Sequence, residues 1–225
     1  MQIFTVIAIL LVSYLIGSIP SGWLVVKIAS GKDVRRIGSG RVGGTNVMRA
    51  VGFLGGFLTG LLDVVKGFSS YWIVGAFLPG DVWLRVAAAA VTILGQIHSI
   101  FLIEKNEHGR WHLRGGAGGA TCLGGAMALF FNSYMVIVPV GVLVFIFIGY
   151  ASLTTISIAL SGLAVFVYLA ATGGGPWQYI LYGLLSLILV LWALRPNLKR
   201  LRAGTERTVG LRAYLQKRRE NRPAG

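Results

Sequence analysis

The chain has 225 residues, of which 55% are hydrophobic and only 12% are charged. A typical soluble domain has about 25% charged residues, and a disordered chain has low hydrophobicity, so the composition excludes both classes. The formal net charge of +14 suits nucleic acid binding in principle, but its distribution along the chain favours a membrane protein with no nucleic-acid partner.

Long apolar stretches predict an all-α polytopic membrane protein, because a helix that crosses a bilayer needs about 20 apolar residues. Seven candidate spans can be read, in chain order: Ile3–Val26, Val51–Leu78, Val82–Ile103, Gly116–Phe131, Tyr134–Tyr150, Ser152–Ala171 and Trp177–Leu194. The fourth and fifth are short, and Asn132-Ser133 predicts a turn between them. One long bent span with a re-entrant piece is the alternative, and it gives five crossings.

Basic residues are distributed unevenly between the connections. Of the 21 Lys and Arg residues, six lie in segment 27–50, three in 104–114 and ten from residue 195 onward, whereas the shorter connections have none. The positive-inside rule makes the basic side cytoplasmic, so the N-terminus is predicted outside and the C-terminus inside, with seven spans or five. We therefore expect a transmembrane domain over 1–194, with cytoplasmic loops 27–50 and 104–115, and a basic cytoplasmic tail over 195–225.

The start of the chain does not have the pattern of a cleaved signal peptide, which begins with basic residues. The first 26 residues contain none, so Met1–Val26 is predicted to be a retained first span. Topology and attraction to anionic membrane lipid account for most of the basic excess. Two sets of residues in the tail have helical spacing, Leu198/Leu201 and Leu211/Tyr214/Leu215, which suits tail segments that lie on the membrane surface.

Two cytoplasmic segments are rich in glycine and lead directly into predicted helices. The first runs from Ile37 to Arg49 and the second from Arg114 to Thr121. Glycine-rich turns and helix N-termini direct several backbone N–H groups at one point and bind phosphate, and arginine adds a forked cationic donor. Close helix packing through small residues is the alternative. Clustering of the glycines with Ser, Thr, Asn and Arg favours phosphate binding.

Asp63 and Lys66 lie within the second apolar stretch and share a helix face at i, i+3. Charges at membrane depth are costly, so the pair has either a functional role or the role of a structural ion pair. The sequence does not distinguish these two interpretations.

Several other kinds of site are missing from the sequence. No histidine is followed five residues later by an aspartate, as His-x4-Asp acyltransferases require, and seven scattered acids do not form a multi-aspartate metal site. A single cysteine, Cys122, excludes an internal disulfide and a cysteine zinc site. His108 and His112 have metal-compatible spacing, but Gly109 weakens the helix that they need. We expect no metal and no cofactor, and a packed or interfacial His98.

Five motifs follow one another along the chain, in segments 17–22, 38–49, 62–67, 115–121 and 194–206. In this order they resemble the motifs of the bacterial acyl-phosphate:glycerol-3-phosphate acyltransferase family, a polytopic family of the cytoplasmic membrane that makes lysophosphatidate. The resemblance extends from about Ile9 to Glu206. The resemblance implies that acyl phosphate and glycerol 3-phosphate are the substrates.

The family match implies catalytic roles for Ser39 and Arg49, which would bind and orient glycerol 3-phosphate. The second glycine loop would cradle the acyl-phosphate headgroup. Other substrate-binding residues are expected in the same patches: Gly38, Gly40, Arg41, Thr45, Asn46, Arg114, Gly115, Gly116, Gly118, Gly119, Thr121, Arg195, Asn197 and Arg200. Asp63, Lys66 and Glu206 are expected to support the site.

The chain departs from the family pattern at positions that belong to the family's substrate site. Ala117 replaces a lysine and Leu194 replaces a histidine, while Arg41 replaces an asparagine. Arg41 or Arg114 is the candidate source of the missing positive charge. An insertion also lengthens the second loop around residues 105–112. A non-catalytic member that binds lipid precursors and a small-anion transporter therefore stay open as alternatives.

Overall fold

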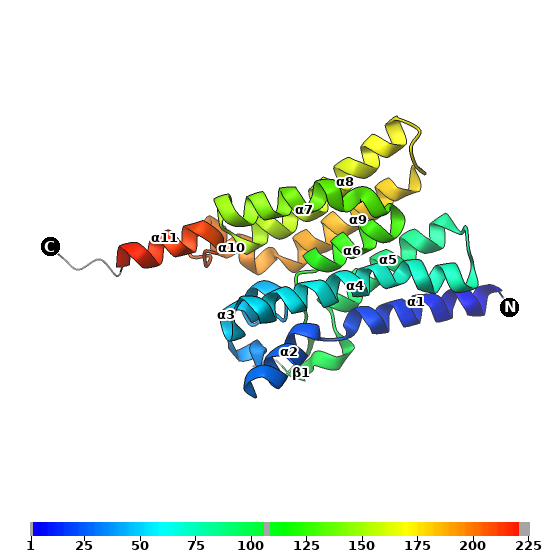
Figure 1. The fold of residues 1–225 in the computed structure, drawn as a ribbon. Coiled ribbons are helices and arrows are strands. Elements are labelled where there is room, and N and C mark those ends of the chain that lie inside the picture. The colour runs from blue at the N-terminus through cyan, green and yellow to red at the C-terminus, as the bar shows by residue number, and fades with distance from the viewer. Residues whose placement is uncertain (1, 106–108, 221–225) are drawn as a thin grey trace.

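The structure, a computed structural model, describes residues 2–105 and 109–220, and within these ranges it is a bundle of helices with one short hairpin (Figure 1). The α-helices are α1 (Gln2–Ser18), α2 (Ser21–Ser30), α3 (Gly44–Val51), α4 (Phe53–Phe77), α5 (Val82–Ile97), α6 (Gly119–Leu129), α7 (Tyr134–Leu143), α8 (Ala151–Ala171), α9 (Gln178–Ala193), α10 (Arg195–Arg202) and α11 (Gly210–Glu220). Short helical turns are η1 (Val34–Arg36), η2 (Ile100–Leu102), η3 (Phe131–Ser133) and the π-turn η4 (Val144–Ile148).

Among the described residues, four helical segments are long and apolar enough to cross a membrane: 2–30, 82–102, 131–148 and 151–171. The pair α9 and α10, bent by 62°, raises this number to five if it forms one span. α4 has 25 residues but contains the charged pair Asp63 and Lys66. α6 has 11 residues, or about 16 Å, which is too short to cross a bilayer. The predicted count of seven spans is therefore not confirmed.

Proline occurs within two predicted spans and marks an interruption in the first of them. The first span consists of α1 and α2, which are separated at Ile19 and Pro20. Proline lacks a backbone N–H and disfavours helical geometry in the preceding residue, so a break at this point is expected. Pro139 lies inside α7, which continues into the π-turn η4.

The prediction of an all-α fold is wrong in the inserted segment. Strands β1 (Ile103–Lys105) and β2 (Trp111–Leu113) pair antiparallel, with Ile103 opposite Leu113 and Lys105 opposite Trp111. The Lys105 ammonium lies 4.9 Å from the centre of the Trp111 ring, which stabilises this pair. Strands of only three residues give too little alternation for a sequence pattern to reveal. His108 lies outside the described residues.

Small residues bring the helices into backbone contact. A Cβ atom on Gly67 of α4 would lie 2.2 Å from the Thr121 carbonyl oxygen of α6, and one on Gly124 would lie 2.0 Å from the Val64 carbonyl oxygen. Any side chain at these positions would force the two helices apart. Glycines inside the spans therefore serve helix packing, as the alternative interpretation of the glycine pattern stated.

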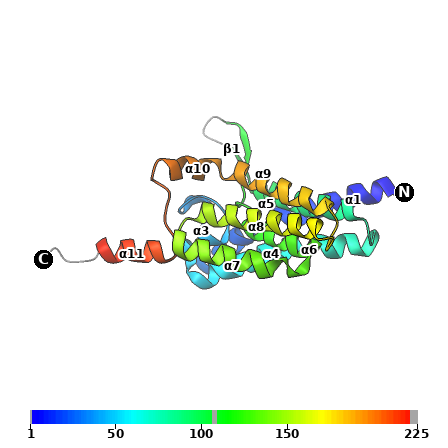
Figure 2. The same cartoon turned by 90° about the horizontal axis from the view of Figure 1, so that it is seen from above.

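The connections separate into two ends of the bundle. Figure 1 shows the N-terminus and the α4–α5 and α8–α9 connections toward one end, and α2, α3, α10 and α11 toward the other. The view from above in Figure 2 gives the same separation. The basic first loop and the basic tail thus lie near each other, on the end where the functional site is found.

Candidate functional site

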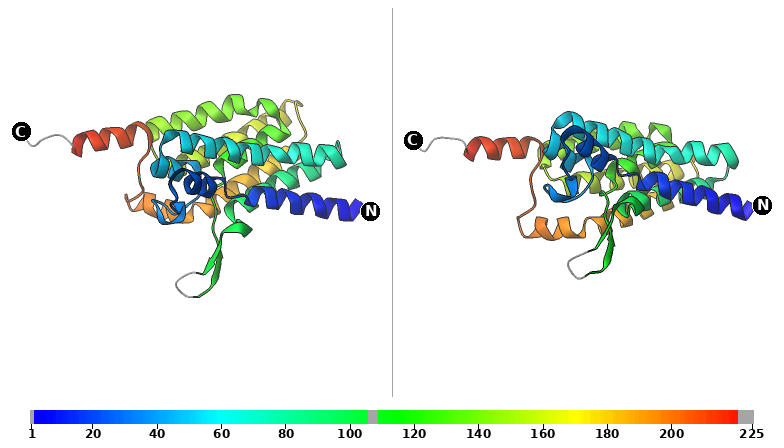
Figure 3. Two further views of the ribbon diagram at one scale, coloured as in Figure 1. Left: turned by 60° about the horizontal axis from the view of Figure 1, so that its bottom comes forward. Right: turned by 90° about the horizontal axis from the view of Figure 1, so that it is seen from below.

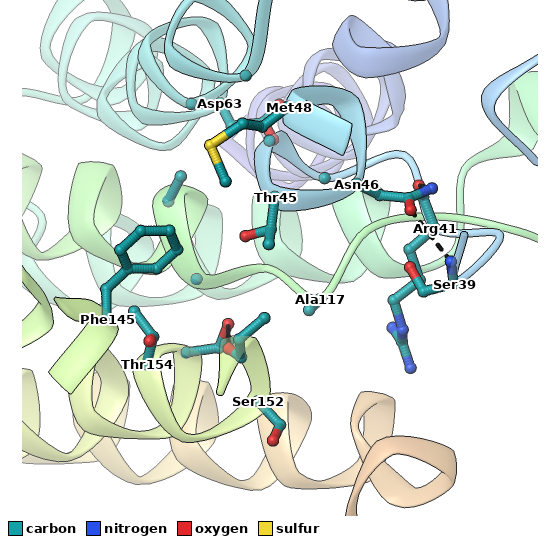
Figure 4. A pocket seen from close by; sticks show the side chains of 18 of the residues that line it. Ser39, Arg41, Thr45, Asn46, Met48, Asp63, Ala117, Phe145, Ser152 and Thr154 are labelled. Atoms are coloured by element: carbon teal, nitrogen blue, oxygen red, sulfur yellow. Dashed lines mark hydrogen bonds between the residues drawn. The ribbon is translucent and has the colours of Figure 1, made fainter. Parts of the chain in front are cut away.

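A cavity of about 720 Å³ lies between the first loop, the second loop, the tail and the adjoining ends of α4 and α8 (Figure 4). Among the described residues, four arginines line it: Arg41, Arg49, Arg200 and Arg207. Apolar side chains also line it, from α4, α6, η4 and α8: Phe53, Phe57, Leu61, Val64, Leu123, Phe145 and Ile158. The cavity therefore combines a strongly cationic region with an apolar one.

The first loop is organised by the buried amide of Asn46. Its Oδ1 accepts a hydrogen bond from the Ser39 backbone N–H at 3.0 Å. Its Nδ2 donates to the carbonyl oxygens of Ile37 at 2.8 Å and Arg41 at 2.9 Å, with a longer contact to Val34 at 3.3 Å. Because the amide is used on the loop backbone, Asn46 shapes the loop from within, and its predicted contact with substrate stays a prediction.

Gly38 allows the loop to close on Asn46. Its φ of 58° lies in the left-handed region, and a Cβ atom would lie 2.2 Å from the Asn46 Oδ1 atom. Glycine avoids both the strain of this conformation and the clash. The neighbouring Ser39 and Thr45 are half-buried and line the cavity.

Arg41 connects three segments that are far apart in the sequence. Its guanidinium donates to the Asn197 Oδ1 atom at 3.2 Å, to the Gly116 carbonyl oxygen at 3.3 Å and to the Ala193 carbonyl oxygen. Burial, together with the nearby charge of Arg200, lowers the pKa of Arg41 to about 10, although Glu206 opposes this shift. Arg41 stays charged at neutral pH and lies beside Ala117, the position of the missing lysine.

Arg49 and Arg207 form a second concentration of positive charge. Burial and the nearby Arg207 lower the pKa of Arg49, with Glu206 acting in the opposite direction. An Arg207 terminal nitrogen also lies 3.1 Å from the position that a Gly38 Cβ atom would take. Arg49 is half-buried and Arg207 is exposed, and two guanidinium groups close together favour an anion as their partner. Sequence reasoning missed Arg207, although it directly follows the matched Glu206.

The tail is fixed by a buried carboxylate. Glu206 accepts hydrogen bonds from Asn197 at 3.1 Å and from Ser152 of α8 at 2.6 Å. Two residues after Glu206, Thr208 forms an isolated antiparallel β-bridge with Tyr150. Glu206 therefore holds the segment with Arg200 and Arg207 against the start of α8, and its supporting role in the site stays a prediction.

The second loop uses its glycines in two ways. A Cβ atom on Gly115 would lie 2.2 Å from the Ile97 carbonyl oxygen, and the Gly116 N–H donates to the Gln96 carbonyl oxygen at 2.8 Å. These two glycines pack against the end of α5 and do not line the cavity. Ala117, Gly118 and Gly119 line it and lead into the N-terminus of α6.

Arg114 lies outside the cavity lining. It forms an ion pair with Glu104, which also lies 3.4 Å from Arg35. The hydrogen bond from Arg35 holds the pKa of Asp33 at about 2, and Asp33 in turn raises the pKa of Arg35. Arg114 thus belongs to a surface ion network. Of the two candidates for the missing positive charge, only Arg41 lies at the cavity.

Asp63 and Lys66 of α4 form a buried polar network at the wall of the cavity. The Lys66 ammonium lies 2.8 Å from Asp63 and donates to the Gln96 side chain at 2.5 Å and the Ile19 carbonyl oxygen at 2.7 Å. The Gln96 amide donates to Asp63 at 2.9 Å. These contacts neutralise the pair and tie α4 to α5 and to the α1–α2 break, which favours the structural ion pair.

The cavity brings together most of the predicted site residues. Those that line it are Gly38, Ser39, Arg41, Thr45, Asn46, Arg49, Asp63, Gly118, Gly119, Asn197, Arg200 and Glu206. Those outside its lining are Gly40, Lys66, Arg114, Gly115, Gly116, Thr121 and Arg195. The Thr121 side chain is buried in α6, whereas Arg195 is exposed.

Across residues 2–105 and 109–220, no three His, Cys, Asp or Glu side chains are grouped so that they could hold a metal ion. His98 stacks against Trp192 with 4.7 Å between the ring centres. This agrees with the predicted packed or interfacial position. The polar groups that line the cavity include arginine side chains and the hydroxyl groups of serine and threonine.

Helices of membrane-spanning length around a cavity that is cationic in one region and apolar in another define a membrane protein suited to phosphorylated, lipid-like compounds. The model of the glycerol-3-phosphate acyltransferase family matches residues 7–204. The chain belongs to this family.

Related proteins agree with this assignment over most of the chain. A glycerol-3-phosphate acyltransferase of Thermus thermophilus is 37% identical, over 91% of this chain and 95% of its own length. Glycerol-3-phosphate acyltransferase 3 of Dehalococcoides mccartyi is 34% identical, over 93% of this chain and 98% of its own length.

Solved structures agree in fold. The crystal structure of PlsY, an integral membrane glycerol 3-phosphate acyltransferase, in its glycerol 3-phosphate form is similar with a TM-score of 0.78 and 29% identity. That match covers 93% of this chain and 98% of PlsY. The lysophosphatidic acid form gives a TM-score of 0.76 at 30% identity.

Proposed function

We propose that this protein transfers an acyl chain from acyl phosphate to the 1-hydroxyl of glycerol 3-phosphate and so forms lysophosphatidate for phospholipid biosynthesis. The observation that carries the proposal is the cavity that joins four arginines of the described chain to an apolar lining between membrane helices. Arginine suits the phosphate groups of both substrates, and the apolar part suits the acyl chain.

The reaction needs no covalent enzyme intermediate, because acyl phosphate is already activated. The 1-hydroxyl oxygen attacks the acyl carbon, an ester bond forms, and the bond between the acyl carbon and the phosphate oxygen breaks. Inorganic phosphate leaves and accepts the hydroxyl proton, so atoms and charge balance. The protein's contribution is to hold two anions close together and to stabilise the developing oxyanion.

The roles of individual residues follow from their positions. Arg49, with Arg207 beside it, would bind the phosphate of glycerol 3-phosphate, and Ser39 would orient its hydroxyl groups. The backbone N–H groups at the start of α6, from Gly118 and Gly119, would face the acyl-phosphate group. Arg41 would supply the positive charge that Ala117 lacks.

A transfer assay with purified protein tests the proposal. The protein, acyl phosphate and glycerol 3-phosphate should produce lysophosphatidate and release phosphate in equal amounts. Omission of glycerol 3-phosphate should stop the release of phosphate. Binding of both compounds without product would favour the non-catalytic alternative, and uptake of phosphate or glycerol 3-phosphate into protein-containing liposomes would favour the transporter.

We further propose that the protein lies in the bacterial cytoplasmic membrane with its N-terminus outside and its cavity mouth and C-terminus in the cytoplasm. The uneven distribution of basic residues supports this orientation. Single cysteines at Asp81 or Gly174, in a Cys122→Ala background, should react with an impermeant reagent added to intact cells. A cysteine at Gly204 should react only after the cells are opened, and the reverse pattern would overturn the orientation.

A further inference from the structure

The inserted hairpin has two different faces. Side chains alternate along a strand, so Glu104 points to one face and its neighbours Ile103 and Lys105 to the other. Glu104 forms ion pairs with Arg35 of the first loop and with Arg114. The opposite face, with Ile103, Lys105 and Trp111, therefore points away from the first loop.

This opposite face is apolar and exposed. Trp111 is 71% exposed and Ile103 is 46% exposed, and the preceding turn η2 adds Ile100 at 43% and Phe101 at 57%. The charged side chain at this face is a lysine, which covers the Trp111 ring. Four large apolar side chains are thus exposed within residues 100–111, and water solvates such a concentration of apolar surface poorly.

The position of the hairpin relative to the bundle identifies what covers this patch. β1 begins at Ile103, directly after the candidate membrane span 82–102. Figure 3 shows the hairpin projecting sideways from the bundle near the end that carries the basic loop. A segment that starts where a span ends and turns sideways lies at the level of the lipid headgroups.

We propose that residues 100–105 and 109–113 form an interfacial anchor whose outer face inserts into the headgroup–acyl boundary of the surrounding membrane. Tryptophan prefers this boundary because its ring is amphipathic, and lysine reaches from it to anionic headgroups. The occupant of the patch is therefore lipid. The proposal rests on the membrane-spanning bundle and is independent of the acyl-transfer reaction.

The anchor is connected to the cavity through backbone hydrogen bonds. The Arg114 N–H donates to the Leu102 carbonyl oxygen at 3.1 Å, and the Ser99 N–H donates to the Arg114 carbonyl oxygen at 3.0 Å. Arg114 is followed directly by Gly115 and Gly116, which pack on the end of α5. A hairpin held at the lipid surface thus fixes the base of the second loop at the membrane boundary.

Nitroxide labels on the full chain test the proposal. Single cysteines replace Ile103 or Trp111 on the outer face, or His112 on the opposite face as the matched control, all in the Cys122→Ala background. The labelled proteins are reconstituted in vesicles of phosphatidylethanolamine and phosphatidylglycerol. Accessibility to oxygen, which partitions into lipid, is compared with accessibility to a water-soluble nickel chelate. Circular dichroism checks that each variant is folded.

The ratio of oxygen to nickel accessibility should be several-fold higher at positions 103 and 111 than at position 112. Lys105→Glu should lower the ratio at position 103 in these vesicles, and less in vesicles of neutral phosphatidylcholine. Equal, water-like ratios at all three positions would overturn the proposal. Protection of positions 103 and 111 from both reagents that increases with the protein-to-lipid ratio would also overturn it, in favour of a second copy of the chain.

Discussion

The first glycine loop (residues 38–49) is shaped by one buried side chain, whereas the second (residues 114–121) is shaped by contact with a neighbouring helix. In the first loop, the Asn46 amide binds the backbone of residues on both sides of the Gly-Ser-Gly turn. In the second, Gly115 and Gly116 lie directly against the carbonyl end of α5. The two loops are thus similarly rich in glycine, but they need it for two different physical reasons.

This difference determines what each loop offers to a substrate. The first loop contributes side chains to the cavity, among them Ser39, Arg41 and Arg49. The second contributes mainly backbone, through Ala117 and the first residues of α6. A cation in the first loop therefore lies beside a loop whose cavity-lining residues are uncharged, and Arg41 provides the contact between them.

The largest effect is expected from Arg49, the cation that we propose binds the phosphate of glycerol 3-phosphate. Arg49→Ala should reduce acyl transfer by about 100-fold or more, equivalent to about 2.7 kcal/mol of lost transition-state stabilisation, because alanine offers no charged donor. Initial rates with purified protein measure the effect. Arg36→Ala, at an exposed position in the same segment, is the control and should leave the rate near wild type. If Arg49→Ala has the same rate as the Arg36→Ala control, Arg49 does not belong to the site.

The organising amide of the first loop gives the second test. Asn46→Ala removes hydrogen bonds to the loop backbone and should lower the free energy of unfolding by about 2 kcal/mol, within the usual range for a buried partner left unmatched. The KM for glycerol 3-phosphate should increase because the loop loses its shape. Unchanged stability and unchanged KM would show that the loop holds its conformation without this amide.

A smaller loss of stability is expected in the second loop. A methyl group at Gly115 would lie 2.2 Å and 2.4 Å from the carbonyl oxygens of Ile97 and Gln96, so the loop must move away from α5. Gly115→Ala should cost about 1 to 2 kcal/mol, as overpacking usually does. Thermal unfolding measures it, with Gly43→Ala as the matched control, since nothing lies within 4 Å of a Cβ atom there. Equal midpoints for the two variants would contradict the packing role.

The smallest expected effect is the coupling between the two loops. Ala117→Lys alone should change transfer modestly, Arg41→Asn alone should depress it, and the double variant should recover part of the loss. We expect a coupling energy of about 1 kcal/mol, which is typical of groups that share a site. A double-mutant cycle in the transfer assay measures it, and independent effects of the two changes would contradict an exchange of the cation between the loops.

Local patterns predicted many of the residues that the structure brings together around the cavity. Ser39, Arg49, Asn197 and Arg200 were expected together from motifs in separate segments, and all four line one cavity. Arg207 was missed because it lies just beyond the last motif. The bridge between Tyr150 and Thr208, which a sequence does not display, helps to bring it to the cavity.

The sequence also predicted features that the structure uses differently. Arg114 was expected to contact substrate, but the inserted hairpin brings Glu104 beside it, and the two form an ion pair outside the cavity. The short apolar stretch after Gly116 was expected to span the membrane, but only 11 residues of it are helical. For Arg114, a contact with a distant segment determines the outcome.

The sequence by itself determined the membrane class, most helices, the two glycine loops and the family resemblance, because apolar length, proline, glycine and charge act over a few neighbouring residues. Only the tertiary structure decided which glycines pack and which face the cavity, which of Arg41 and Arg114 lies at the cavity, and where the hairpin points. These outcomes depend on contacts between residues far apart in the chain, such as Arg41 with Asn197 at 3.2 Å, and no local pattern encodes them.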